Sequence, residues 1–526
     1  MAIGQPYLAI DLGAESGRLI LGNLKDDRLF LSEVYRFGNE AVLLNDGLHW
    51  NVLNLWSQIK TGISAGARKS GKSLKGIGLD AWGVDFALLD RQGTLLSNPF
   101  HYRDTRTDGM LEQAFERMPR SEIFANTGIQ FMQINTLYQL LAMVLSDSPL
   151  FEMADTLVTI PDLFNYWLSG EITCEFTNAT TTQCYNPLSE DWAWSVLQSL
   201  GIPDHIFKKI VQPGSVLGNL RSAVALEAGL GDIPVIAPSC HDTGSAVVAV
   251  PAEGKNFAWI SSGTWSIVGA ETRSPLTNEI ALDANLTNEG GVFGAWRLSK
   301  NVMGLWLVQE CRRAWDRAGG DLSYDEITRL AEHARPFIAV IDPDDIRFLH
   351  PGDMPARIQA YCRETSQMVP ETRGEIIRTA LESIALKYRW VLESLEEATD
   401  SRLETVHIIG GGAKNQLLNQ LTADASRRIT IAGPVEATAT GNLLMQAITL
   451  GDLSSLDEAR EIVRHSFDLQ SYMPSSVGGW DDAYAKLGKL IEAGTTDRDG
   501  MTRRPQSAHT HTYRSDENER HEDDSH

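Results

Sequence analysis

The sequence predicts an α/β protein that is divided into two domains of related design. A chain of 526 residues exceeds what one hydrophobic core usually serves, so more than one domain is expected. Strand-like apolar runs alternate with segments of helical spacing, which is typical of the α/β class. Two hairpins with small residues in their loops, Tyr7–Leu24 and Phe257–Glu271, lie about 250 residues apart. We therefore expect domains at 1–249 and 250–492, followed by a tail at 493–526.

The hairpin near the start of the chain is expected because apolar runs flank a polar stretch. Leu8–Ile10 and Leu19–Leu21 are the expected strands, and residues 11–18 form the tip between them. Beyond it, apolar residues three or four positions apart predict helices, and short apolar runs predict strands. The expected helices are Val52–Ala67 and Leu111–Arg117, and the expected strands are Lys75–Leu79 and Phe86–Leu89.

The second half repeats the pattern of a hairpin followed by helices. Phe257–Ile260 leads through the small residues of Ser261–Ser266 into another apolar run. The elements expected after it are helices at Asn301–Ala318, Gly374–Glu397 and Asn415–Ala425, with a strand at Thr405–Ile409 that ends in Gly410–Gly412. From residue 493 the chain is polar, charged and nearly free of aliphatic side chains, so we expect it to be disordered.

Composition excludes several classes of function. A formal charge of −23 argues against a broad nucleic-acid surface, which needs clustered Lys and Arg. No run reaches the roughly 18 to 20 apolar residues of a membrane helix, and the first residues lack the pattern of a secretion signal. The five cysteines are scattered and odd in number, so we expect reduced thiols. These features predict a cytoplasmic protein that binds neither nucleic acid nor membrane.

One segment matches the GxxxxGK[ST] pattern of a phosphate-binding P-loop, but its surroundings contradict that function. The match is Gly66–Ser73. A P-loop follows a buried strand and opens a helix, whose N-terminus faces the phosphates. Here a helical pattern precedes the match and a strand pattern follows it. We therefore expect the glycines to end a helix and Lys72 to lie in a solvated turn.

A stronger candidate for phosphate binding is the tip of the first hairpin. Its glycines allow close backbone approach to phosphates, and Ser16 and Arg18 can donate hydrogen bonds to phosphate oxygens. Asp11, at the end of the strand, can hold a hydrated magnesium ion. Glu15 is an anion beside a proposed anion site, so it must point outward or help to hold the metal. The alternative is an ordinary hairpin turn.

A candidate catalytic group follows the apolar strand Pro234–Ala237. His241 and Asp242 come directly after it, at the carboxyl end of a strand, where α/β sheets carry their sites. A carboxylate placed on an attacking hydroxyl accepts its proton as the bond to phosphorus forms. The alternative is a turn in which the aspartate caps a helix.

Taken together, these motifs resemble the FGGY family of carbohydrate kinases, which includes kinases for glycerol, xylulose and rhamnulose. The motifs occur in the family's order at Asp11–Arg18, His241–Thr243, Ser261–Ser266 and Gly410–Gly412. Further segments are most similar to the family members that act on L-rhamnulose. These segments are Asp80–Phe86, Tyr102–Asp104, Thr127–Phe131, Asn135–Leu140, Thr177–Gln183, Asn301–Trp306 and Gly433–Ala437.

The resemblance implies two actin-like (ribonuclease H-like) domains with a cleft between them, with ATP mainly on the second and the sugar mainly on the first. It implies that Asp242 is the base and that Asp11 holds Mg²⁺. The residues implied to bind ATP are Ala14, Glu15, Ser16, Gly17, Arg18, Thr264, Gln309 and Gly411. Those implied to line the sugar are Gly83, His241, Asp242, Thr243 and Asn301. Trp82 and Asp85 are further candidates, each of which could instead serve packing or an internal hydrogen bond.

The activity implied by the resemblance is transfer of the ATP γ-phosphoryl group to the 1-hydroxyl of L-rhamnulose. The expected partners are a small ketose and ATP, without an obligatory protein partner. Two alternatives are a kinase for another ketose, such as xylulose or fuculose, and a non-catalytic actin-like nucleotide-binding protein. The pair His241–Asp242 argues against the latter, because a regulator needs no base on the sugar side.

Overall fold

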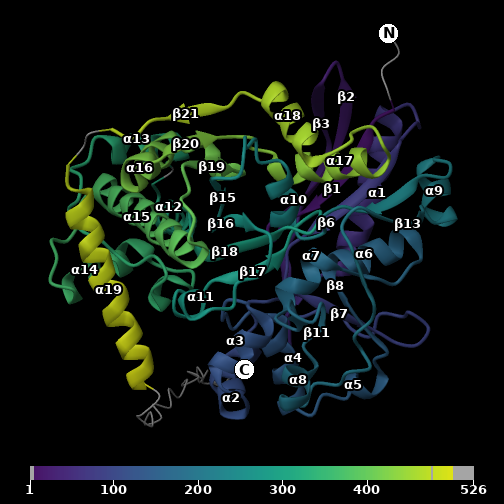
Figure 1. Cartoon of the computed structure of the whole chain (residues 1–526), viewed down its shortest axis with the longest axis horizontal. Coiled ribbons are helices and arrows are strands. Elements are labelled where there is room, and N and C mark those ends of the chain that lie inside the picture. Colours follow the sequence, from purple (N-terminus) through teal and green to yellow (C-terminus); the bar gives the residue numbers. More distant parts are fainter. Residues whose placement is uncertain (1–4, 321, 476–477, 502–526) are drawn as a thin grey trace, which may run out of the picture.

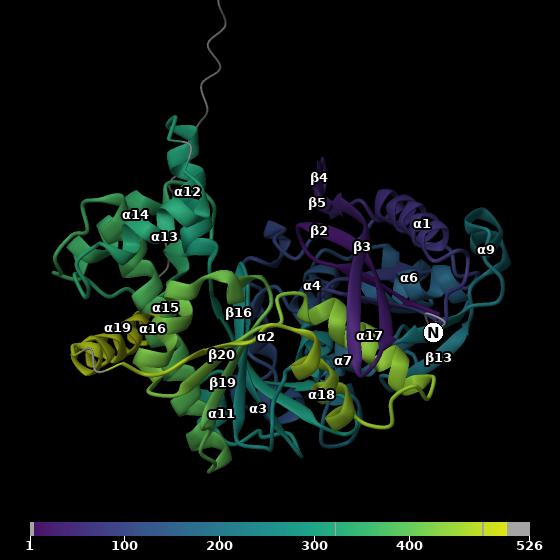
Figure 2. The same ribbon diagram turned by 90° about the horizontal axis from the view of Figure 1, so that it is seen from above.

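The computed structural model describes residues 5–320, 322–475 and 478–501. Two mixed β-sheets, each with its own helices, lie side by side in Figures 1 and 2. We call them the first and second lobes, after their order in the sequence. The remaining residues, which include most of the expected tail at 493–526, lie outside the described part of the chain.

The first lobe is built on a six-stranded sheet of order β13-β14-β6-β1-β2-β3. β1 pairs antiparallel with β2 and parallel with β6, and β14 pairs parallel with β6. The carboxyl ends of β1, β6 and β14 therefore meet at one edge of the sheet. The strands are β1 (Tyr7–Leu12), β2 (Ser16–Lys25), β3 (Arg28–Gly38), β6 (Gly76–Ala81), β13 (Ser215–Asn219) and β14 (Pro234–Ala237).

The second lobe repeats this plan in a seven-stranded sheet of order β17-β18-β16-β15-β19-β20-β21. β15 pairs antiparallel with β16 and parallel with β19, as β1 does with β2 and β6. The expected relation between the two hairpins is thereby confirmed. The strands are β15 (Phe257–Ser262), β16 (Trp265–Thr272), β17 (Thr287–Gly290), β18 (Trp296–Met303), β19 (Thr405–Ile409), β20 (Ile429–Ala432) and β21 (Gln470–Tyr472).

Both faces of each sheet are covered, as the unbroken apolar runs of the central strands require. Along β1, Leu8 and Ile10 point into a core with α1 (Val52–Lys69) and α6 (Ile160–Ser169), whereas Tyr7 and Ala9 point into another core. Phe257 and Trp259 of β15 enter this other core from the second lobe. Each sheet thus contributes one face to a shared core.

The shared core also contains the helices α10 (Asp242–Val248) and α17 (Ala437–Thr449), together with buried residues of α18 (Leu456–Ser466). α17 contacts β1, β6 and α10, and α10 contacts β15 (Figure 1). A Cβ atom at Gly441 would lie only 1.7 Å from the carbonyl oxygen of Ser245. Glycine is therefore required for the two helices to approach this closely.

The other elements surround these layers. In the first lobe the helices are α2 (Met110–Arg117), α3 (Arg120–Thr127), α4 (Thr136–Leu145), α5 (Leu150–Met153), α7 (Phe176–Ala179), α8 (Trp194–Ser199) and α9 (Ser222–Ala228). Short strand pairs are formed by β4 (Ala41–Leu44) with β5 (Gly47–Trp50), β7 (Phe86–Leu89) with β8 (Thr156–Thr159), β9 (Cys174–Glu175) with β12 (Ile210–Val211), and β10 (Tyr185–Asn186) with β11 (Asp191–Trp192). In the second lobe the helices are α11 (Glu279–Asp283), α12 (Trp306–Arg317), α13 (Tyr324–Glu332), α14 (Met354–Glu364), α15 (Arg373–Thr399), α16 (Gln416–Ser426), α18 (Leu456–Ser466) and α19 (Trp480–Met501).

Two sequence expectations need correction. Asn301 was expected to begin a helix, but it lies in β18, where it pairs with Ile267 of β16. The helix begins only after Gly304, at Trp306. The helix prediction failed because β18 is buried on both faces. Its apolar residues therefore do not alternate with exposed ones, which is the pattern that would have indicated a strand. The second correction concerns the tail, since α19 continues to Met501 and thus runs past residue 493.

The expectations for the segment that matches a P-loop and for the cysteines are confirmed. α1 ends at Lys69 and β6 follows the turn, so the segment that matches a P-loop has the order helix to strand, and Lys72 is exposed. All five cysteines are free and buried. Among the described residues, no helix is long and apolar enough to span a membrane.

Candidate active site

A cavity of about 330 Å³ lies where the two lobes meet, at the carboxyl ends of β1, β6 and β14. Eight of the predicted site residues line it: Ala14, Arg18, Gly83, His241, Asp242, Thr243, Asn301 and Gly411. The second hairpin adds Ser261–Gly263 and Trp265 to the same wall. Tertiary structure therefore brings together residues that are almost 400 residues apart in the chain.

The remaining predicted residues lie around this cavity rather than in its wall. Asp11 is buried, and its carboxylate forms an ion pair with Arg18 at 2.8 Å. Ser16 closes the hairpin through its carbonyl oxygen, which accepts from the N–H of Gly13 at 2.9 Å. A Cβ atom at Gly17 would lie 2.3 Å from the ring of Phe37. The hairpin tip is therefore shaped by close packing and does not expose every one of its residues.

Glu15 points outward, which is one of the two possibilities that the sequence argument left open for it. Its side chain is 62% exposed, and its carboxylate lies 3.6 Å from the guanidinium of Arg313 on α12. Arg313 also forms an ion pair with Glu310 at 2.7 Å. Glu15 thus contacts the other lobe across the edge of the cleft. An exposed pair of this length contributes little to stability.

On the side of the second lobe, Thr264 and Gln309 lie close to the second hairpin. The carbonyl oxygen of Thr264 accepts from the N–H of Trp306 at the start of α12. Gln309, one turn further along α12, has a buried Oε1 atom with no hydrogen-bond partner among the described residues. An unsatisfied buried acceptor costs free energy, so it fits a donor that arrives with a ligand.

Three carboxylates, those of Asp11, Asp80 and Asp242, lie close enough together beside the cavity to affect one another. Asp11 and Asp80 are direct neighbours across β1 and β6. Burial, and then the charge of Asp11, raise the pKa of Asp80 well above its ordinary value. Burial also raises the pKa of Asp242, and Asp11 adds to this effect. A neighbouring like charge raises the pKa of a carboxyl group because it disfavours the ionised form.

Asp80 was not predicted as a site residue, although its position tests whether a metal fits here. It is fully buried, its Oδ2 atom accepts from the side chain of Asn442 at 2.5 Å, and its Oδ1 atom has no partner among the described residues. Carboxylate oxygens are the ligands that Mg²⁺ prefers, usually with water and phosphate oxygens. Asp11 and Asp80 together therefore provide a donor set that fits a hard divalent cation.

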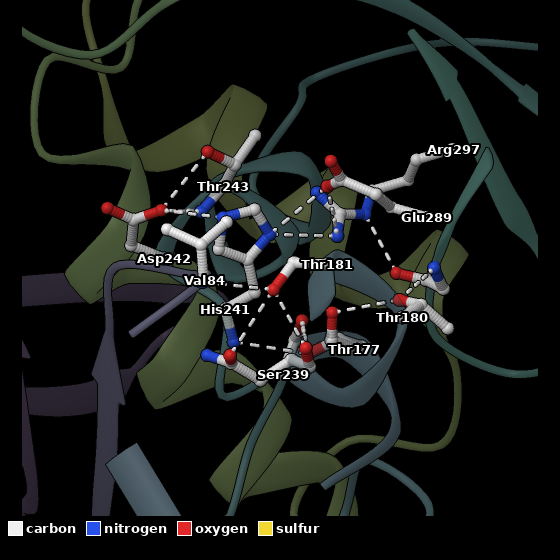
Figure 3. Close-up of polar contacts among 12 residues, drawn as sticks. Val84, Thr177, Thr180, Thr181, Ser239, His241, Asp242, Thr243, Glu289 and Arg297 are labelled. Atoms are coloured by element: carbon white, nitrogen blue, oxygen red, sulfur yellow. Dashed lines mark hydrogen bonds and ion pairs between the residues drawn. The ribbon is translucent and has the colours of Figure 1, made fainter. Parts of the chain in front are cut away.

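His241 and Asp242 stand at the N-terminus of α10, at the end of the cavity nearest the first lobe. Oδ1 of Asp242 accepts from the hydroxyl of Thr243 at 3.1 Å, and it lies 3.4 Å from Nε2 of His241 (Figure 3). Among the described residues, all hydrogen bonds and ion pairs recorded for this carboxylate involve Oδ1. Oδ2 is thereby left for a group inside the cavity.

A buried turn rich in threonine, residues 177–183, holds the surrounding loops in place. The hydroxyl of Thr177 accepts from the N–H of His241 at 3.1 Å, and that of Thr181 accepts from the N–H of Val84 at 3.2 Å. The hydroxyl of Thr180 accepts from the N–H of Gly290 in the second lobe at 2.8 Å. Figure 3 shows these three contacts around one turn. The sequence pattern did not reveal this role.

The same turn explains why glycine occupies position 83. A Cβ atom at Gly83 would lie 2.9 Å from Oγ1 of Thr181. The turn is itself anchored by Glu175, which accepts from the hydroxyl of Thr177 at 2.6 Å and from the N–H of Cys240 at 3.1 Å. Burial raises the pKa of Glu175 to about 8. The loop around Gly83 and the loop around His241 are therefore both hydrogen-bonded to the same buried turn.

The structure resolves the alternatives for Asp85 and Trp82. Asp85 is fully buried, and its carboxylate accepts from the ring N–H of Trp82 at 2.9 Å, from that of Trp50 at 2.6 Å and from Gln139 at 2.9 Å. Burial raises the pKa of Asp85 to about 6. Asp85 therefore serves an internal hydrogen-bond network, whereas Trp82 belongs to this network and also lines the cavity.

Close packing between the second hairpin and the glycine-rich turn shapes the other end of the site. A Cβ atom at Gly412 would lie 2.0 Å from the hydroxyl of Ser262, and Gly410 has a φ of +83°. A second cavity, of about 370 Å³, adjoins this turn, and Val435 lines both cavities. The two cavities together offer space for an elongated ligand.

Residues that sequence reasoning missed complete the site. Gln130 forms two hydrogen bonds with the backbone of Asn301. Its Oε1 atom accepts from the N–H of Asn301 at 2.8 Å, and its Nε2 atom donates to the carbonyl oxygen of Asn301 at 3.2 Å. Glu289 and Thr287 of β17 line the cavity as well. Gln130 lies in one of the segments that carried the resemblance, whereas β17 carries no motif by which it could have been found.

Comparisons with known proteins identify the family to which the chain belongs. The sequence model of the FGGY family of carbohydrate kinases, N-terminal domain, matches residues 6–249, and that of the C-terminal domain matches residues 258–450. A rhamnulokinase of Bacteroides thetaiotaomicron is 43% identical over 480 residues, which are 91% of this chain and 98% of the relative. A rhamnulokinase of Oceanobacillus iheyensis is 41% identical over 90% of this chain and its own entire length.

Solved structures share the fold at low sequence identity. A gluconate kinase from Lactobacillus acidophilus has a TM-score of 0.75 at 16% identity, covering 95% of this chain and 98% of its own. A xylulose kinase from Rhodospirillum rubrum has a TM-score of 0.76 at 17% identity, covering 94% and 99%. The repeated lobes, the cavity between their hairpins and the sequence matches over nearly the whole chain lead to one conclusion: the chain belongs to the FGGY family of carbohydrate kinases.

Proposed function

We propose that this protein is an ATP-dependent kinase that phosphorylates L-rhamnulose at its 1-hydroxyl, forming L-rhamnulose 1-phosphate and ADP. The observation that carries the proposal is the identity of 41–43% to three rhamnulokinases, over about nine-tenths of this chain. The site supports it, because a carboxylate with an available oxygen faces a cavity between the two hairpins.

Asp242 acts as the base. Its Oδ2 accepts the proton of the sugar hydroxyl while that oxygen bonds to the γ-phosphorus and the bond from phosphorus to the bridging oxygen of ADP breaks. Thr243 and His241 contact Oδ1 of the same carboxylate and hold its orientation. Because the N-terminus of α10 faces the reacting groups, its positive end also favours the developing negative charge.

ATP extends from the hairpins toward the second cavity. Its phosphates lie between the tip Ala14–Arg18 and the loop around Thr264, where backbone N–H groups and Arg18 donate hydrogen bonds. Its nucleoside lies toward Gly411 and Gln309, whose buried Oε1 atom then finds a donor. Mg²⁺, held through Asp11 with Asp80 beside it, would neutralise charge on the phosphates.

The sugar end of the cavity has both polar and apolar walls. Asn301, held by Gln130, provides an amide group for hydroxyls, and Gly83 leaves space beside Thr181. The apolar side chains Ile129, Met132, Ile134 and Val84 line another part of it. L-rhamnulose is a 6-deoxy ketose, so its terminal methyl group matches an apolar wall better than a hydroxymethyl group does.

Further parts of the proposal concern organisation and setting. We assign the sugar side to a unit at 1–249 and the nucleotide side to a unit at 250–492. The buried free thiols and the acidic composition suit a cytoplasmic protein with small-molecule partners only.

The decisive experiment is an ADP-release assay with the purified protein across L-rhamnulose, L-fuculose, D-xylulose and glycerol at saturating ATP and Mg²⁺. We expect the highest kcat/KM for L-rhamnulose. Faster turnover of xylulose or glycerol would reject the substrate assignment but keep the kinase. ATP binding without phosphorylation of any sugar would instead support the non-catalytic alternative.

A further inference from the structure

A fully buried arginine contacts the ring of His241 from the opposite lobe. Arg297 lies in β18 with 0% of its side chain exposed, and its Nη2 atom lies 3.0 Å from Nδ1 of His241 (Figure 3). Its Nε–H donates to the carbonyl oxygen of Gly290 at 2.8 Å. Neither the catalytic step nor the binding of ATP as described above uses this side chain.

Glu289 balances the charge of Arg297. The two residues are directly opposite each other in the ladder between β17 and β18, and Nη2 of Arg297 lies 3.1 Å from Oε2 of Glu289. Although burial acts in the other direction, Arg297 and His241 lower the pKa of Glu289. A buried arginine is costly unless it is paired in this manner. Arg297 and Glu289 therefore form a buried ion pair that contacts the ring of His241.

The first turn of α10 packs closely around the contact between Arg297 and His241. A Cβ atom at Gly244, in the first turn of α10, would lie 3.5 Å from Cζ of Arg297 and 2.1 Å from the hydroxyl of Ser239. The contact with Ser239 is the one that requires glycine here, because 3.5 Å from Arg297 is an ordinary packing distance. On the other side, Thr177 accepts from the backbone N–H of His241 and holds its main chain.

The chemistry of the donors decides which nitrogen of His241 carries hydrogen. A guanidinium has only N–H donors, so Nδ1, which it contacts at 3.0 Å, has to be the acceptor. The hydrogen of the neutral ring then lies on Nε2, which is 3.4 Å from Oδ1 of Asp242. Oε2 of Glu289 also lies 3.3 Å from Nδ1 and would favour the opposite tautomer if Arg297 were absent.

We propose that Arg297, held by Glu289, is a positioning residue that fixes His241 as the Nε2–H tautomer, so that the ring donates toward Oδ1 of Asp242. Oδ1 is thereby occupied, and Oδ2 remains directed at the sugar hydroxyl. This inference rests on the proposed role of Asp242 as the base. It also makes the base depend on a contact between the lobes, because Arg297 belongs to β18 and His241 precedes α10.

The test combines spectroscopy with kinetics on the full chain. Proteins labelled with ¹⁵N at histidine are compared as wild type, Arg297→Met and Arg297→Lys, with the signals of His241 assigned by their loss in His241→Gln. The matched control is Arg378→Met, which removes the pair of Arg378 with the buried Glu382, at 2.6 Å, near the start of α15 in the same lobe. Circular dichroism and thermal unfolding show which variants fold.

We expect an unprotonated Nδ1 and a protonated Nε2 in the wild type and in Arg378→Met. In Arg297→Met, Glu289 should accept from Nδ1–H, so the tautomer should invert. The kcat for the sugar should fall by about 10- to 100-fold, because misplacing a reacting group by 1 Å costs about 100-fold. The KM for ATP should change by less than about twofold, and Arg297→Lys should recover part of kcat.

Three results would overturn the inference: a protonated Nδ1 in the wild type, an unchanged tautomer in folded Arg297→Met, or an unchanged kcat in that variant. If neither Arg297 variant folds, the wild-type tautomer alone decides. Failure of the proposed function is distinguishable, because a wild type that phosphorylates none of the sugars would still report its tautomer.

Discussion

Replacement of Asp242 by asparagine tests the proposed mechanism most directly. Asparagine keeps the size of the side chain and an oxygen that can accept from Thr243, but it cannot take a proton from the sugar. A general base contributes about 100- to 10,000-fold in rate. At about 1.4 kcal/mol for each factor of ten, the barrier should rise by about 3 to 5 kcal/mol.

The structure also predicts what this substitution should leave unchanged. Burial and the charge of Asp11 raise the pKa of Asp242, which means that the ionised carboxylate lowers the stability of the folded protein. An uncharged amide removes this destabilisation. The melting temperature should therefore stay the same or rise. ATP affinity should change little, because the side chain faces the sugar end of the cavity.

The assay measures kcat at saturating L-rhamnulose together with ATP affinity, and Lys72→Ala provides the control. Lys72 is exposed in the turn between α1 and β6, so its loss should be nearly silent. A P-loop lysine would behave oppositely, because it contacts phosphate directly. An active Asp242→Asn enzyme beside an inactive but folded Lys72→Ala enzyme would refute both the mechanism and the reading of the hairpins.

The remaining predictions concern pH, stability and nucleotide binding. Because the base works ionised and the pKa of Asp242 is raised, kcat/KM should fall with decreasing pH at values above the ordinary aspartate pKa of about 3.9, as a pH profile can show. Asp85→Asn places an amide N–H₂ group among the three donors Trp50, Trp82 and Gln139. The free energy of unfolding, measured by urea titration, should fall by about 1–3 kcal/mol, and an unchanged value would contradict the network. Glu436 forms an ion pair with Arg18, so Glu436→Gln should free Arg18 for phosphate and lower the KM for ATP by about two- to fivefold. A raised KM would instead mean that Glu436 supports the nucleotide site.

Several parts of the fold and the site follow from local patterns in the sequence. The limits of α1 and β19 were predicted to within two residues, because caps and apolar spacing act over one or two turns. Asp11, His241 and Asp242 were identified because they stand where strands end, and the carboxyl ends of parallel strands meet at one edge. Arg18 was identified because it can donate hydrogen bonds from the tip of the first hairpin. The assignment of Asn301 to a helix was wrong because a strand buried on both faces loses its alternation.

What the sequence by itself determined is therefore local: two hairpins of one design, the strand ends that carry polar groups, and an acidic composition that argues against a nucleic-acid surface. Only the tertiary structure decided which distant residues meet. Arg297 reaches His241, and Asp80 lies beside Asp11, through pairing between strands that no sequence period encodes. The physical reason is that period and capping depend on neighbours within a few residues, whereas burial and charge pairing depend on the packing of whole sheets.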